Sequence, residues 1–107
     1  MKYKVFLITD AEKDITEIYD YISQNDSTGK AENLLQKLEE TCNSLSQLPN
    51  RGHIPPELER IGIYEYQEIH YTHYRIIYQV IESSIYIHCV LDGRRNLQEL
   101  LSIRILR

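Results

Sequence analysis

The sequence has no tryptophan, one phenylalanine and two cysteines among its 107 residues. Cys42 and Cys89 stand at apolar positions of a predicted helix and a predicted strand. We therefore expect two buried free thiols, not a disulfide or a metal site. No Cys/His spacing resembles that of a zinc site, and no Asp/Glu/His cluster has ligand spacing along the chain. The sequence thus predicts no metal and no cofactor.

The chain also lacks a run of 18 or more apolar residues and a basic-then-apolar leader. From these absences we expect that the chain does not span a membrane and carries no secretory signal, and that the protein resides in the cytoplasm. With 42% hydrophobic and 26% charged residues, the composition is that of one globular domain covering residues 1–107.

An excess of positive charge is missing as well, since the net charge is −4 and the pI is about 5.5. A protein that binds nucleic acid by bulk electrostatics is expected to be basic, so this class is disfavoured. The charge is nevertheless uneven. Asp10–Asp20 holds five acids and one lysine, whereas Arg94–Arg107 holds four arginines and one glutamate. A locally basic end on an acidic protein suits a defined anionic partner surface.

Periodicity and capping signals predict seven elements. Thr9 and Glu12 form a capping-box pattern, Ser27 is a candidate N-cap for the second helix, and Pro49 ends that helix. Asn50–Gly62 is expected to be a loop. The expected elements are strands at Tyr3–Ile8, Tyr66–Tyr71, Tyr74–Ile81 and Ser84–Leu91, helices at 9–23 and 27–48, and a short helix from about Leu97 to Leu101 or beyond.

The predicted fold class is therefore α+β, in the order β-α-α-β-β-β with a short C-terminal helix. The two long helices should form a hairpin on one face of a small, mainly antiparallel sheet. Two helices cover only one face, so we expect the other face, or the groove at its edge, to be solvated or given to a partner. The apolar tail after Leu97 either docks on the sheet or forms an interface.

The hairpin near the C-terminus places three arginines where an anionic group could bind. Arg94 and Arg95 directly follow the last strand, and Arg75 lies within the preceding one. The alternative is that Arg75 pairs with Glu65 or Glu68 on a solvated face. Strand alternation places His88 opposite Ile85, Ile87 and Cys89, where it is exposed and available for binding. For His88, as for His70 and His73, no suggestively spaced carboxylate or nucleophile indicates a catalytic triad.

Four segments together resemble a known family. They are D-x-x-x-I-Y-D-Y-I at 14–22, L-P-N-R-G at 48–52, Y-R-I-I-Y-Q-V at 74–80 and V-L-D-G-R-R-N-L at 90–97. Their order and spacing, with the predicted element order, are similar to those of the RelE/ParE superfamily of type II toxin–antitoxin toxins. The resemblance covers essentially the whole chain. It implies a small toxin that a cognate antitoxin neutralises. The implied assembly is a toxin homodimer or a toxin–antitoxin hetero-oligomer.

The resemblance leaves two targets open, because the RelE branch cuts mRNA in the ribosome and the ParE branch inhibits DNA gyrase. Arg75 and Arg95 match two arginines of the metal-independent RelE nuclease site. The resemblance also implies two lysines and a late tyrosine in that nuclease site. This sequence has Tyr66 and Glu68 at the positions of the lysines and Leu101 at that of the tyrosine. A carboxylate repels phosphate. The chain is therefore more similar to the ParE branch, for which the expectation is a gyrase inhibitor without chemistry of its own.

The alternatives are a ribosome-dependent mRNA endoribonuclease, with Arg75 and Arg95 as its catalytic residues, and an inactive relic that only binds its antitoxin. In the favoured interpretation, Arg75, Arg94, Arg95 and His88 contact the target or the antitoxin, and no residue binds a metal.

Overall fold

The computed structural model describes residues 2–106. Its elements follow the order β1 (Lys4–Leu7), α1 (Thr9–Asn25), α2 (Thr28–Asn43), a 3-10 turn at Ser44–Ser46, α3 (Pro56–Glu59), β2 (Gln67–Tyr71), β3 (Tyr74–Ile81), β4 (Ser84–Asp92) and α4 (Gln98–Leu106). The sheet order is β1-β4-β3-β2, with β1 parallel to β4 and the other pairs antiparallel. The predicted α+β class and order of the strands along the chain are confirmed.

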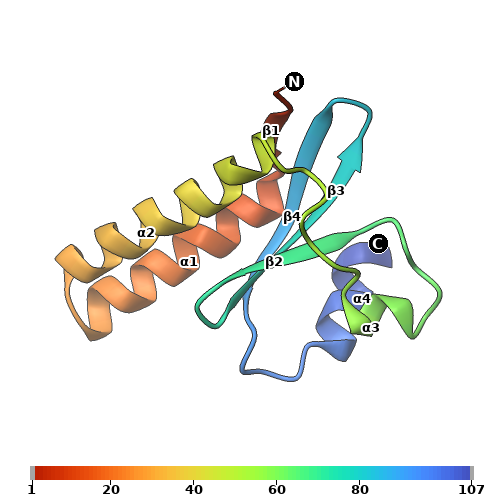
Figure 1. Ribbon diagram of the computed structural model, residues 1–107. Helices are drawn as coiled ribbons and strands as arrows, with labels where there is room; N and C mark the ends of the chain where they lie inside the picture. Colours follow the sequence, from red (N-terminus) through yellow and green to blue (C-terminus); the bar gives the residue numbers. More distant parts are fainter. Residues whose placement is uncertain (1, 107) are drawn as a thin grey trace.

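The long helices form the predicted hairpin on one face of the sheet, and their connecting turn projects well beyond the strands (Figure 1). Their apolar stripes bury one hydrophobic core against that face. Its buried members are Ala11, Ile15, Leu38, Cys42, Leu45, Ile69, Tyr74, Ile76, Tyr78, Ile85, Ile87 and Val90. Burial raises the pKa of the Cys42 thiol to about 12, and Glu39 contributes in the same direction. Cys42 and Cys89 are both buried, and they form no disulfide, as predicted.

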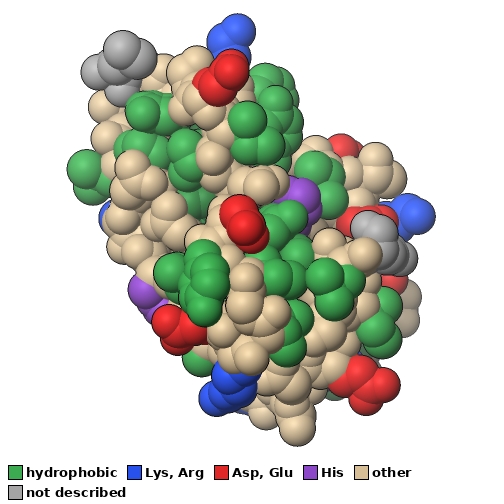
Figure 2. Space-filling model, turned by 90° about the vertical axis from the view of Figure 1, so that its right-hand side faces the viewer, with side chains coloured by type: hydrophobic (Ala, Val, Ile, Leu, Met, Phe, Trp, Pro, Cys, Tyr) green, Lys and Arg blue, Asp and Glu red, His purple; other side chains and the backbone are tan. Residues whose placement is uncertain are grey.

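The opposite face of the sheet is not open, which corrects the prediction of a solvated or partner-bound face. The short helices α3 and α4 lie together against it (Figure 1). A second core joins Leu58, Ile77, Cys89, Leu91, Leu97 and Leu101. The apolar tail therefore docks on its own sheet. Figure 2 shows this side of the molecule, where hydrophobic side chains remain visible among scattered charges.

Two local predictions at helix starts have different outcomes. Ser27 caps α2, since its hydroxyl accepts a hydrogen bond from the Lys30 amide. The Thr9–Glu12 capping box is wrong: Ile8 is the N-cap, and Thr9 is already helical. The Ile8 amide still donates to the Ile87 carbonyl, and the Glu12 amide donates to the Ile8 carbonyl. The chain thus passes from the end of β1 into α1 without a side-chain cap.

A β-bulge in the β3–β4 hairpin was not predicted. Ile77 pairs with Cys89 and Tyr78 with Ile87, so His88 is an extra residue in β4. Beyond the bulge, alternate side chains of β4 point to the opposite faces of the sheet from those that an unbroken strand would give them. Ile87 faces the first core and Cys89 faces the second. The predicted placement of Ile85, Ile87 and Cys89 on one face is therefore wrong beyond His88.

Candidate functional site

The first candidate site is an open groove of about 580 Å³ between α1 and the end of the β3–β4 hairpin. Arg94 and Arg95 lie on its rim, and the side chain of Tyr21, 66% exposed, lies along it. The full lining is Asp14, Glu17, Ile18, Tyr21, Ile22, His73, Tyr74, Val90, Leu91, Asp92, Arg94 and Arg95. Charged rims around an apolar floor are typical of a surface that binds another macromolecule.

The two arginines of the rim differ in their bonding. Arg94 donates to both carboxylate oxygens of Asp92, with Nε–Oδ1 at 3.0 Å and Nη2–Oδ2 at 2.8 Å. This contact lowers the pKa of Asp92 and raises that of Arg94. Among residues 2–106, no carboxylate lies within ion-pair distance of the Arg95 guanidinium, which is exposed. Arg95 is therefore the cation of this rim that remains available to a partner.

Gly93 allows the strand end to turn closely past β3. Its amide donates to the His73 carbonyl at 2.7 Å. A Cβ on Gly93 would lie 2.8 Å from that oxygen and from the Arg75 stem. The D-G-R-R segment thus needs glycine at this position to present the arginines. His73 also borders the groove, and its Nε2 has no hydrogen-bond partner within the described part of the chain.

Arg75 is not part of this groove, although the sequence grouped it with Arg94 and Arg95. Its guanidinium lies on the face of α3 and bonds Glu57 at 2.6 and 2.7 Å. It also bonds Glu68 at 2.6 and 2.8 Å. These hydrogen bonds, with Glu57 first and Glu68 second, raise the pKa of Arg75, and those with Glu57 lower the pKa of that carboxyl. The alternative interpretation, a pair with Glu68, matches the geometry, with Glu57 in place of Glu65.

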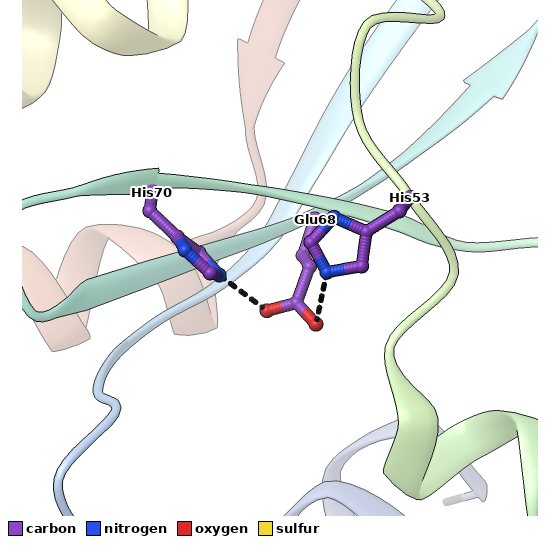
Figure 3. Close-up of side chains that lie close together, drawn as sticks. All are labelled: His53, Glu68 and His70. Carbon is purple, nitrogen blue, oxygen red and sulfur yellow. Dashed lines mark hydrogen bonds and ion pairs between the residues drawn. The ribbon is translucent and has the colours of Figure 1, made fainter.

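Glu68 is the centre of a second candidate site on that face (Figure 3). Its side chain is 1% exposed, and each carboxylate oxygen also meets a histidine. His70 Nε2 lies 3.1 Å from Oε1, and His53 Nε2 lies 3.3 Å from Oε2. Sequence reasoning missed this group, because Glu68 lies 15 positions after His53 in the chain. The only local signal was His70, which lies on the same side of a strand as Glu68.

The loop that brings His53 to β2 is held by Tyr78. The Tyr78 hydroxyl donates to the Pro49 carbonyl at 2.9 Å and accepts from the Gly52 amide at 3.1 Å. A Cβ on Gly52 would lie 2.6 Å from the Glu68 carbonyl oxygen, so glycine is required here. His53 and Glu68 then exchange backbone hydrogen bonds of 3.2 and 2.7 Å. The L-P-N-R-G segment is therefore a loop fitted to the outer edge of β2.

His88, a predicted binding residue, is half-buried at the bulge and lies edge-on to Tyr66, with ring centroids 5.1 Å apart. Burial, and secondarily the charge of Arg104, lower the pKa of His88. Arg104 also donates to the His88 carbonyl at 3.0 Å. His88 thus belongs to the packing under α4, and it is not a lining residue of the groove at Arg95.

Comparison with known proteins agrees with this architecture. A family model described as the ParE toxin of type II toxin–antitoxin system, parDE, matches residues 5–97. The chain therefore belongs to the ParE toxin family and is a toxin component of the type II class. No curated protein sequence matches the chain.

Solved structures share the fold at low identity. One is a chromosomal ParDE toxin–antitoxin system from P. aeruginosa, with a TM-score of 0.70 and 19% identity over 83% of this chain and 94% of that chain. Another is the toxin–antitoxin complex RelBE2 from Mycobacterium tuberculosis, with a TM-score of 0.63 and 19% identity over 84% and 96%. The shared fold thus spans both branches of the superfamily. No helix among the described residues is long and apolar enough to cross a membrane.

Proposed function

We propose that this toxin acts in the cytoplasm by binding DNA gyrase, and that a cognate antitoxin neutralises it by covering part of the toxin surface. The observation that carries the proposal is the state of Arg75. Cleavage of RNA without a metal needs a cation that is free to stabilise the developing charge on phosphate. The Arg75 guanidinium is instead held by two carboxylates and is 13% exposed. Glu57, Glu68 and Arg75 together carry one negative charge, which repels phosphate.

The groove at Arg95 supports binding as the mode of action. It combines an exposed tyrosine, apolar side chains and an arginine that forms no ion pair within residues 2–106, which are the residue types that anchor protein interfaces. Growth arrest through such a surface requires no metal, and we expect EDTA to leave target binding unchanged in an assay whose target is itself metal-independent.

The antitoxin is proposed from the family and from the neighbouring structures, which are toxin–antitoxin systems. A partly disordered antitoxin segment that folds on binding would suit the helical hairpin and the groove beside α1. Co-expression with the adjacent gene should give a complex that elutes as one species in size-exclusion chromatography at micromolar concentration. Separate elution would contradict the antitoxin proposal.

The second candidate is a ribosome-dependent ribonuclease, which one specific observation favours. His53 and His70 are both half-exposed and lie at the buried Glu68 carboxylate, so the site holds side chains of the types that act as general acids and bases. The cation at the same site, Arg75, is already occupied by carboxylates. We therefore place this candidate second.

One paired experiment separates the two targets. Purified toxin is added to a plasmid supercoiling reaction with gyrase and to a reconstituted translation mixture with mRNA. We expect inhibited supercoiling and intact mRNA. Cuts in mRNA at codon positions together with normal supercoiling would establish the ribonuclease. If neither reaction responds at concentrations well above micromolar, the protein is a relic that only binds its antitoxin.

A further inference from the structure

Three ligand atoms converge on the face of the sheet that carries α3. They are His53 Nε2, a Glu68 carboxylate oxygen and His70 Nε2, and all lie within 4.8 Å of one another. Figure 3 shows His53 on the loop and Glu68 and His70 on β2, with both imidazoles directed at the same carboxylate. This group lies apart from the groove at Arg95, whose lining does not include it.

We propose that His53, Glu68 and His70 form a binding site for a divalent transition-metal ion, with Zn²⁺ as the representative ion. Two imidazoles and one carboxylate are a donor set that zinc accepts, with a fourth position left for water. Each histidine coordinates through Nε2 as the neutral imidazole and carries its proton on Nδ1.

The distances fit such an ion. Zinc–nitrogen and zinc–oxygen bonds of about 2.0–2.2 Å place tetrahedral ligand atoms about 3.4 Å apart. His70 Nε2 lies 3.1 Å from Glu68 Oε1, and His53 Nε2 lies 3.3 Å from Oε2, so each imidazole is close to this spacing from one oxygen of the carboxylate. The two imidazoles must still approach each other and one shared oxygen of Glu68, and their side chains, 50% and 62% exposed, have room to turn.

The backbone around the three ligands is already ordered. His53 and Glu68 face each other across a β-bridge with two backbone hydrogen bonds, and His70 follows on the same side of β2. Gly52 and Tyr78 fix the loop at this edge. Little backbone conformational entropy is therefore lost when an ion binds, which favours affinity.

The surrounding charges also favour a cation. Glu57 compensates Arg75, so the group of Glu57, Glu68 and Arg75 has a net charge of −1 when both histidines are neutral. Arg75 donates to both oxygens of Glu68 and thereby orients the carboxylate, as an outer partner of a metal ligand does. An anion at this position would meet two carboxylates.

A bound ion would join the His53 loop to β2 and stabilise the folded toxin. Since the growth-arresting groove lies elsewhere, the site adds stability and is not needed for target binding. The metal-site inference does not depend on gyrase being the target.

The test is a titration of the purified toxin with Zn²⁺ in competition with a chromophoric chelator. The test variants are H53Q and H70Q, because a glutamine amide can still donate to Glu68 but is a poor zinc ligand. H73Q and H88Q are matched controls at histidines outside the site. We expect one equivalent to bind to the wild type and to both controls, and each test variant to lose at least tenfold in affinity.

A second readout uses structure and stability. Co²⁺ in place of Zn²⁺ should give the visible absorption bands of a four-coordinate site. Zn²⁺ should raise the Tm of the wild type but not that of the double variant H53Q/H70Q. Circular dichroism confirms that each variant is folded. Equal Zn²⁺ affinity of the wild type and H53Q/H70Q would overturn the proposal, and so would an equal loss in the H73Q and H88Q controls.

Discussion

Single residues in this toxin separate into those held by the fold and those available to a partner. Arg75, Arg94 and Arg95 look equivalent in the sequence, yet the first two are paired with carboxylates. An ion pair lowers the free energy gained from a second anionic partner, because the existing pair must first be broken or shared. Arg95 therefore carries the functional prediction at this scale.

Replacing Arg95 by glutamate should abolish growth inhibition, because the change reverses the charge at the groove rim. The measurement is growth after induction, together with inhibition of gyrase supercoiling by the purified variant. K30E is the matched control, since it changes net charge by the same amount at an exposed position near the turn between α1 and α2. Undiminished toxicity of R95E, or equal loss in K30E, would count against the groove.

At the scale of elements, side chains satisfy the part of the β4 backbone that extends past its neighbour β1. β1 pairs with β4 only as far as Leu7 and Ile87. Beyond that point the Val90 amide donates to Asp14 Oδ2 at 3.0 Å, and Arg104 donates to the His88 carbonyl. Arg104 also bonds both oxygens of Asp14 at 3.0 and 2.9 Å. One ion pair thus joins α1, β4 and α4.

Breaking this pair should be costly, because Asp14 and Arg104 are only 11% and 12% exposed. We expect D14N to lower the free energy of unfolding by about 3 kcal/mol, since it leaves Arg104 without its anionic partner. Urea denaturation followed by circular dichroism measures the change.

The control is D26N, which removes the carboxylate of an exposed i,i+4 pair with Lys30 and should cost about 0.5 kcal/mol or less. A cycle with R104M isolates the pair, and a coupling energy below about 1 kcal/mol would show that the contact does not close the edge as described.

At the scale of the whole molecule, the sheet separates two hydrophobic cores. Leu38 is buried in the core under α1 and α2, and Leu101 in the core under α3 and α4. Replacing either by alanine should lower the free energy of unfolding by about 2–5 kcal/mol through lost burial and a residual cavity.

Because the two leucines lie in separate cores, the double variant should lose the sum of the single effects within about 0.5 kcal/mol. Urea unfolding of the two single variants and the double variant tests this. L48A, at a side chain that is 62% exposed, is the control and should change stability by about 0.5 kcal/mol or less. A clear departure from additivity would mean that the two cores are coupled through the sheet.

Much of the fold followed from local pattern alone. The helical hairpin, the Ser27 cap and the β3–β4 hairpin each depend on residues close together in the chain, so periodicity and capping chemistry were enough to predict them. The four short motifs likewise identified the toxin family, and the structure shows why three of them have the residues they do. Asp14 closes an edge of the sheet, Gly52 fits a loop against β2, and Gly93 allows a close turn.

Only the tertiary structure decided what the opposite face of the sheet does and which charges remain available. The bulge at His88 redirects Cys89 and Leu91 toward α4, and α3 brings Glu57 to Arg75. Such contacts join residues far apart in the chain, and nothing local in the sequence specifies them. The sequence by itself thus determined the elements and the family, whereas three-dimensional packing decided that Arg75 is occupied, that Arg95 is available, and that two histidines meet at Glu68.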